Sequence, residues 1–315
     1  MSFDNNQIFM LSILIPIYNY NITNLVKALH QQCEKAEIDF EILCFDDGSE
    51  DGFKNQNKSI ESLKHAIYKE LPKNLGRSKI RNELGRAAQY KYLLFMDCDS
   101  KVVSESYIKN YIEKLDSNSL LYGGRIYQSE PPQKEFYFHW FYGTHREQMS
   151  VEERKKNPYQ SFMTNNFLIP KVIFLNFLFD ENLTQYGHED TMFGLQLKLA
   201  QVPILHIDNP LEHKGLETTV SFLNKTKQGI ENLLYLSQKN DLIDTKLLRT
   251  FKKIKSLNFT YFVDFAFQLL KKRLLQNFHS SNVNLKFFDF YKLGLLIKAD
   301  QKVKPPSKRK KAFDL

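Results

Sequence analysis

Three short apolar runs, each ended by polar or acidic residues, restrict this chain to a small group of folds. The runs cover residues 10–17, 40–45 and 92–96, and apolar residues recur at helical spacing in 23–33 and 74–89 between them. A further helix is expected at 60–66 and a short strand at 65–71. Strands that alternate with helices in this way predict a parallel, doubly wound α/β sheet.

Two carboxylates one residue apart, Asp97 and Asp99, stand where the third apolar run ends. Positions i and i+2 of an extended segment point to the same side, and ligands of open α/β sheets bind outside the carboxyl ends of the strands. The pair can therefore meet one divalent cation or a ribose. The alternative is an ordinary turn, because Asp is a common turn residue.

The composition is that of a soluble globular protein, with 42% hydrophobic and 25% charged residues. A length of 315 residues suffices for one large α/β domain with a C-terminal extension, or for two domains. The apolar stretch 8–17 is too short and too interrupted for a signal peptide or a membrane span. Three scattered cysteines, without disulfide or zinc-site spacing, favour a reducing, cytoplasmic environment.

The net charge of +8 is concentrated near the C-terminus, at 271–273 and 308–311. No motif of the usual DNA- or RNA-binding modules is present, so no nucleic-acid partner is expected. A helix predicted at 259–278 combines aromatic residues with the first basic cluster, a pattern of helices that lie on anionic membrane surfaces. The alternative is an ordinary helix that packs on the preceding domain.

Five short segments occur in a characteristic order, and together they resemble the family 2 inverting glycosyltransferases, whose catalytic domain has the GT-A fold. The resemblance covers about residues 10–215, and neither a Walker loop nor a GxGxxG motif after a strand offers a rival nucleotide fold. The segments are Pro16-Ile17-Tyr18-Asn19, Asp46-Asp47-Gly48-Ser49, residues 74–82, Asp97-Cys98-Asp99 and Gly187-His188-Glu189-Asp190.

The resemblance implies a GT-A-type, mostly parallel doubly wound sheet flanked by helices, in a catalytic domain over residues 1–215. A helical C-terminal extension is expected over 216–300. Residues 301–315 are expected to form a disordered basic tail.

A nucleotide-sugar site is expected at the ends of the first two strands. An acid after the second strand can accept a hydrogen bond from a uracil N–H, and Tyr18 offers an aromatic wall. Arg77 and Arg81 lie one helical turn apart, so both can address one phosphate group. The alternatives are an Asp-Gly turn and an exposed helix face. The full set is Pro16, Tyr18, Asn19, Asp46, Asp47, Arg77, Arg81 and Asp97.

The resemblance also assigns the metal and the catalytic acids. It implies that Asp99 holds Mn²⁺ or Mg²⁺, with His213 as a further ligand, although a lone histidine is often structural. Asp190 matches the family's general base, and Glu189 would orient the acceptor or cap the following helix.

Three residues are candidates for the acceptor side. Asn165 and Asn166 could bind a sugar hydroxyl or belong to a turn. Trp140, within the aromatic run 136–142, could form a sugar-facing wall or belong to the core.

The sequence thus predicts a metal-dependent, inverting hexosyl- or N-acetylhexosaminyl-transferase. It would move sugar from a UDP-sugar to a glycan or lipid-linked glycan, in bacterial surface polysaccharide synthesis, in the cytoplasm or at the inner face of the cytoplasmic membrane. One alternative is a nucleotidyltransferase acting on sugar phosphates, which normally has a Gly-rich basic loop where residues 16–19 stand. The other is a non-catalytic sugar- or membrane-binding module, against which the complete set of acids argues.

Overall fold

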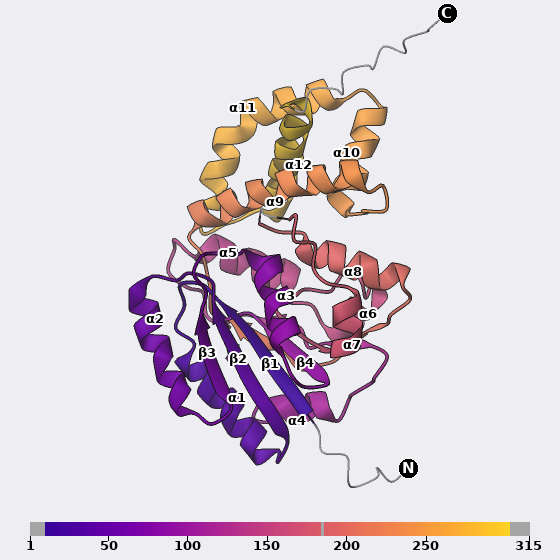
Figure 1. Ribbon diagram of the computed structural model, residues 1–315. Coiled ribbons are helices and arrows are strands. Elements are labelled where there is room, and N and C mark those ends of the chain that lie inside the picture. Colours follow the sequence, from indigo (N-terminus) through magenta and orange to yellow (C-terminus); the bar gives the residue numbers. More distant parts are fainter. Residues whose placement is uncertain (1–9, 184–185, 303–315) are drawn as a thin grey trace, which may run out of the picture. The chain divides into compact units, whose positions relative to one another are not determined.

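The computed structural model describes residues 10–183 and 186–302, and the chain divides into two compact units between Thr218 and Thr219. The first unit is built on a seven-stranded sheet of order β3-β2-β1-β4-β8-β6-β9, in which Figure 1 shows β3, β2, β1 and β4 side by side. Strands β1 to β4 are parallel neighbours, β8 is antiparallel to β4 and β6, and β9 is parallel to β6. The mostly parallel α/β sheet expected from the sequence is confirmed.

The three apolar runs form the centre of this sheet. They are β1 (Met10–Ile17), β2 (Asp39–Asp46) and β4 (Tyr92–Met96), and nearly every residue in them is buried. Strands covered by helices on both faces need such continuous apolar sequence. The other strands of the sheet are β3 (Ala66–Glu70), β6 (Leu120–Tyr122), β8 (Asn166–Pro170) and β9 (Ile204–His206).

Helices cover both faces of the sheet and form two separate hydrophobic cores. The first core contains buried residues of α1 (Thr23–Lys35) and α4 (Tyr107–Ile112). The second contains those of α3 (Arg77–Ala87), α7 (Lys171–Asn176) and α8 (Glu189–Leu199). The helix α3 begins directly after Gly76, whose φ of +84° is a conformation that glycine adopts without steric cost.

A small second sheet joins three distant segments beside the end of β4. Its strands are β5 (Ser100–Val102), β10 (Leu211–His213) and β7 (Arg125–Ile126). The chain between β7 and β8 forms α5 (Tyr137–Tyr142), a π-helical turn (Gly143–Glu147) and α6 (Val151–Lys156). This sheet brings the segments of Asp99, Arg125 and His213 together.

The prediction of a helix at 60–66 was wrong in both position and helix type. The chain forms α2 (Asp51–Asn57) and then a 3₁₀ turn (Lys58–Ser62), and β3 begins at Ala66. Apolar residues at 60, 63 and 66 recur every three residues, and this period suits a 3₁₀ turn as well as an α-helix.

The second unit consists of four helices in its described part, α9 (Thr219–Lys239), α10 (Lys246–Ser256), α11 (Thr260–Phe278) and α12 (Leu285–Lys302). The last of them packs against the other three. Because α12 continues to Lys302, residues 301 and 302 are helical, and the rest of the expected tail, 303–315, lies outside the described residues. Within the described ranges, no helix is long and apolar enough to cross a membrane.

Only some of the aromatic residues expected over 259–278 are buried. Phe267, Leu274 and Phe278 are buried, whereas Phe259 and Phe262 are exposed. Aromatic residues lie on both sides of this helix, so helical spacing alone could not identify the buried one.

Asn166 ties β8 to the chain around it. Its side-chain oxygen accepts hydrogen bonds from the hydroxyl groups of Tyr107 (2.6 Å) and Tyr111 (2.7 Å). Its side-chain nitrogen donates to the backbone oxygens of Gly124 and Asn209, at 2.9 Å each. The residue is fully buried, so this placement speaks against the expected contact with an acceptor.

We predict that Asn166→Ala lowers the free energy of unfolding by about 3 kcal/mol, because four hydrogen bonds are lost and the buried Tyr107 hydroxyl and Asn209 carbonyl lose the partner that Asn166 gives them. Urea denaturation of the full chain measures this loss. Asn118→Ala, at an exposed position, should unfold like the wild type. Equal stability of the two variants would contradict the structural role of Asn166.

Candidate active site

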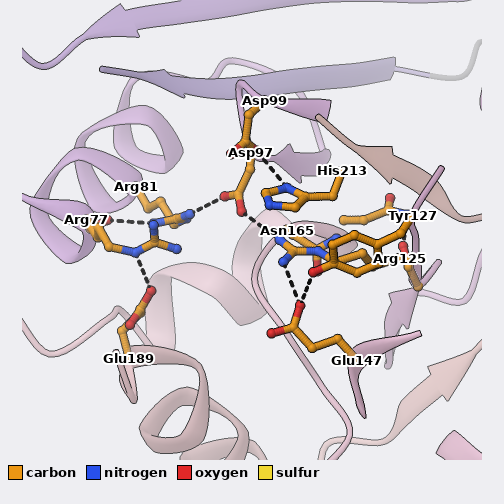
Figure 2. A network of polar contacts seen from close by, with 12 residues as sticks. Arg77, Arg81, Asp97, Asp99, Arg125, Tyr127, Glu147, Asn165, Glu189 and His213 are labelled. Atoms are coloured by element: carbon orange, nitrogen blue, oxygen red, sulfur yellow. Dashed lines mark hydrogen bonds and ion pairs between the residues drawn. The ribbon is translucent and has the colours of Figure 1, made fainter. Parts of the chain in front are cut away.

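Acidic and basic side chains converge beyond the carboxyl ends of β1, β2 and β4 (Figure 2). Asp97 follows the last residue of β4, and its backbone N–H donates to the backbone oxygen of Asn165 at 3.2 Å. Figure 2 shows the arginines of α3 on one side of the two aspartates, with His213 and Arg125 on the other. The expected alignment of strand ends therefore gathers the charged residues at one place.

Asp97 lies between two arginines. One of its oxygens accepts from Arg81 at 2.5 Å, and the other accepts from Arg125 at 3.4 Å. The Arg81 side chain is only 2% exposed. A buried guanidinium group needs such a counter-charge, because an unpaired charge away from water costs several kcal/mol.

The contacts of Arg125 extend this network to the π-helical turn. Arg125 donates to Glu147 at 3.1 Å, and Glu147 also accepts from the Tyr127 hydroxyl. Although burial opposes ionisation of Glu147, Arg125 and His139 lower the pKa of its carboxyl group. The turn that follows α5 is thereby linked to Asp97 through one guanidinium group.

Glu189 forms an ion pair with Arg77, at the side of the site formed by α3. The Nε atom of Arg77 donates to Glu189 at 2.6 Å, and the Glu189 side chain is 7% exposed. Burial would raise the pKa of Glu189, but the guanidinium groups of Arg77 and Arg81 outweigh it and lower the pKa to about 2. Glu189 is therefore ionised at physiological pH and bound to α3. The expected position at the start of α8 is confirmed.

Asp190, the next residue, has a different environment. One of its oxygens accepts from the backbone N–H of Thr191 at 2.7 Å and from the Thr191 hydroxyl at 3.3 Å. Burial and the neighbouring Glu189 charge raise the pKa of Asp190 to about 6. A carboxylate of this kind can accept a proton near neutral pH.

Asp99 and His213 face each other across the end of the small sheet. The Oδ1 atom of Asp99 and the Nδ1 atom of His213 lie 3.5 Å apart. Neither atom has a hydrogen-bond partner in the described ranges, and both are buried. Burial opposes ionisation of Asp99, but His213, Arg125 and Arg77 hold its pKa well below its usual range.

These two side chains fit a divalent cation. A carboxylate oxygen and an imidazole nitrogen are both ligands of Mn²⁺. Because Asp99 Oδ1 and His213 Nδ1 form no hydrogen bond within the described ranges, their lone pairs are available to coordinate an ion. The rings of Tyr127 and His139 pack against the His213 ring, with centroids 5.4 and 5.6 Å away. Among the described residues there is no group of three or more His, Cys, Asp or Glu side chains that could hold a metal ion.

The acids after β2 hold the protein's own loops. Asp46 is fully buried and accepts from the backbone N–H of Ser49 and the hydroxyl of Tyr68. Asp47 accepts from the backbone N–H groups of Leu75 and Gly76 at 2.6 and 3.0 Å. The hydrogen bonds from Leu75 and Gly76 to Asp47 fix the start of α3. Asp47 therefore positions Arg77, whatever else it binds.

The other expected nucleotide contacts surround the end of β1. Tyr18 is 56% exposed, and Pro16 is partly buried within the strand. The side-chain oxygen of Asn19 accepts from the backbone N–H of Glu50 at 2.8 Å, so Asn19 joins this turn to the one after β2. Of the three, Tyr18 presents the most surface to a ligand.

Two expected acceptor contacts remain. Asn165 is 2% exposed, and its side-chain oxygen accepts from the Tyr122 hydroxyl at 3.3 Å. Trp140 is partly buried in α5, and its indole N–H donates to the backbone oxygen of Gln128 at 2.8 Å. Trp140 is the more accessible of the two.

Sequence reasoning missed Arg125, Tyr127 and Glu147. The Arg125–Glu147 and Arg125–Asp97 pairs join residues 22 and 28 positions apart. No periodic spacing links these positions, and the small sheet that places Arg125 has strands of only two or three residues.

A close approach of Gly215 to Asp99 generates a test of the cation site. A Cβ atom added at Gly215 would lie 2.0 Å from Asp99 Oδ2, so Gly215→Ala must displace the carboxylate. We predict a loss of Mn²⁺ affinity of about 10- to 100-fold, the range for residues that position a metal ligand. Titration calorimetry with Mn²⁺ measures it. Gly52→Ala, where an added Cβ meets nothing within 4 Å, is the control. Equal affinity of the two variants would contradict the site.

Two curated proteins are similar to the chain in sequence. The uncharacterized glycosyltransferase YfnE of Bacillus subtilis is 25% identical over 246 residues, which cover 60% of this chain and 60% of that protein. Chondroitin synthase of Escherichia coli is 29% identical over 220 residues, which cover 59% of this chain and 32% of that protein. The chain thus spans about 60% of the length of YfnE and about one third of the length of chondroitin synthase.

Solved structures share the fold. The mannosyltransferase PcManGT from Pyrobaculum calidifontis, in complex with GDP-Man and Mn²⁺, has a TM-score of 0.57 at 12% identity, covering 94% of this chain and 87% of that chain. S. aureus TarS 1–349 in complex with UDP has a TM-score of 0.50 at 16% identity, covering 92% and 89%. At such identities the likeness concerns the fold alone.

The model of the family described as Glycosyl transferase family 2 matches residues 12–179, more than half of the chain. The matched segment contains the two aspartates after β4 and also Arg77 and Arg81 of α3. This match favours the glycosyltransferase interpretation over the nucleotidyltransferase alternative. The chain therefore belongs to glycosyl transferase family 2.

Proposed function

We propose that this enzyme transfers a hexose or N-acetylhexosamine from a UDP-sugar to a glycan or lipid-linked glycan, with inversion at the anomeric carbon. The observation that carries the proposal is a division among the acids of the site. Arginines hold Asp97 and Glu189, whereas Asp99 faces His213 and Asp190 has a raised pKa. In this proposal Asp97 and Glu189 maintain the structure of the site, Asp99 binds the metal ion and Asp190 accepts the proton.

The donor would lie across the ends of β1 and α3. Tyr18 supplies an exposed ring beside the base. Arg77, whose side chain is 41% exposed, is the most accessible of the three arginines of the site and would bind the diphosphate. Asp47 fixes the loop that carries Arg77. The UDP complex of TarS supports a UDP-sugar, whereas PcManGT binds GDP-Man.

A divalent cation, Mn²⁺ or Mg²⁺, would be held by Asp99 and His213. The Mn²⁺ in the PcManGT complex supports this cofactor. When bound, the cation supplies positive charge to the diphosphate as that group leaves.

Asp190 is proposed as the general base. The acceptor hydroxyl oxygen forms the new bond to the anomeric carbon, and its proton passes to the Asp190 carboxylate. The bond between the anomeric carbon and the diphosphate breaks, and UDP leaves with the electron pair. Glu189 stays ionised beside Arg77 throughout, because its pKa lies near 2. Its charge helps to keep Asp190 basic.

The acceptor and the subcellular location are also part of this proposal. Trp140 could stack on an acceptor sugar, and the chondroitin synthase among the relatives supports a polysaccharide product. We place the enzyme in bacterial surface polysaccharide synthesis, in the cytoplasm or at the inner face of the cytoplasmic membrane.

The pKa of Asp190 generates a prediction for the pH dependence. Because the base must be ionised, kcat/KM should rise with pH up to about 6 and then level off. Asp190→Asn should lower kcat by about 10²- to 10⁴-fold and remove this limb of the profile, while UDP-sugar affinity stays unchanged. Initial rates between pH 5 and 8 and titration calorimetry measure the two effects.

Asp51→Asn is a matched control, since its side chain is 94% exposed on α2. It should behave like the wild type in both measurements. An Asp190→Asn variant that turns over normally would place the base elsewhere. One that loses UDP-sugar binding would instead assign Asp190 to donor or metal binding.

A further inference from the structure

Four large apolar side chains form an exposed stripe on α11. Tyr261, Phe262, Phe265 and Leu269 are 73%, 64%, 63% and 71% exposed. Their positions, one, four and eight residues after the first, lie on one face of a helix. We call these four residues the aromatic stripe.

The packing of α11 makes this exposure unusual. Its opposite face already packs on α12, where the Phe267 ring contacts the ring of Tyr291 at 5.8 Å between centroids. Gly294 of α12 allows this approach, since an added Cβ would lie 2.3 Å from the Phe267 ring. A surface helix with one buried face normally presents polar residues on the other. Contiguous apolar surface of this kind marks an interaction site.

The charge of this unit identifies the kind of partner. Residues 219–302 carry fifteen Lys and Arg side chains against six Asp and Glu side chains, a formal net charge of +9. Residues 1–218 carry 24 against 29, a formal net charge of −5. On α11, Lys272 and Arg273 are exposed and continue the face of the aromatic stripe toward the C-terminal end. The one acid of the helix, Asp264, lies off this face, and Gln268 donates to it.

A partner must therefore offer apolar contact and negative charge together. A second copy of the chain fits poorly, because two units of charge +9 would repel each other. An anionic lipid bilayer offers both, since aromatic side chains enter the region between headgroups and acyl chains while Lys and Arg side chains reach the phosphate groups.

We propose that α11 lies on an anionic membrane surface, with the aromatic stripe inserted at the interface and Lys272 and Arg273 against the lipid headgroups. The proposal stands on residues of the second unit alone and holds for any donor or acceptor of the enzyme. Failure of the proposed sugar transfer would leave it intact. It also gives a physical reason for the opposite charges of the two parts of the chain.

Sedimentation of the full chain with vesicles tests the proposal. The vesicles are phosphatidylcholine alone, or phosphatidylcholine with about 30% phosphatidylglycerol. We expect the bound fraction to be at least tenfold higher with the anionic vesicles, and to fall at about 0.5 M salt. The double variant F262E/F265E should lose binding by at least tenfold.

The matched control is V220E/L242E, which adds the same charge at equally exposed apolar positions of the same unit, 59% and 57% exposed. It should bind like the wild type. Equal losses in the two double variants, or equal binding to both kinds of vesicle, would overturn the proposal. Light scattering gives a third readout: a wild-type dimer that F262E/F265E converts to a monomer, without vesicle binding, would make the stripe an interface between copies. Circular dichroism melting of each variant checks the fold.

Discussion

The buried ion pair between Arg81 and Asp97 is the contact on which the geometry of the site depends. It joins α3 to the end of β4, and Arg81 also donates to the backbone oxygen of Arg77 one turn earlier. The buried Arg81 guanidinium group depends on this counter-charge, because an unpaired charge away from water is costly. The pair therefore sets where the chain after β4 turns, and this turn carries Asp99 toward the small sheet and His213.

From this pair, a chain of charges crosses the site. Arg125 lies on the far side of Asp97 and contacts Glu147, while Arg77 holds Glu189 at the start of α8. Five segments of the first unit are thereby connected by three guanidinium groups. Such contacts hold Asp97, Glu147 and Glu189 in place, and they lower the pKa values of the two glutamates. Among the described residues, Asp99 and Asp190 form no ion pair with an arginine, and they are the acids that we propose to bind the cation and to accept the proton.

Much of this site could be predicted because strand ends are visible in the sequence. The apolar runs stop where the acids begin, and parallel strands place their carboxyl ends at one edge, which located Asp97, Asp99 and the arginines of α3. The roles of Asp46 and Asn166 could not be foreseen, because their partners Tyr68, Tyr107 and Tyr111 are chosen by packing. Arg125 was missed for the same reason. On α11, aromatic residues on both sides of the helix concealed which side is buried.

The most direct test of this division among the acids is electron spin echo spectroscopy of Mn²⁺ bound to the full chain together with UDP. We predict nitrogen coupling from a directly bound imidazole, which disappears in His213→Gln and remains in His139→Gln, whose ring lies beside that of His213. Absence of nitrogen coupling in the wild type, or the same coupling in His213→Gln, would contradict the assignment of Asp99 and His213 to the cation.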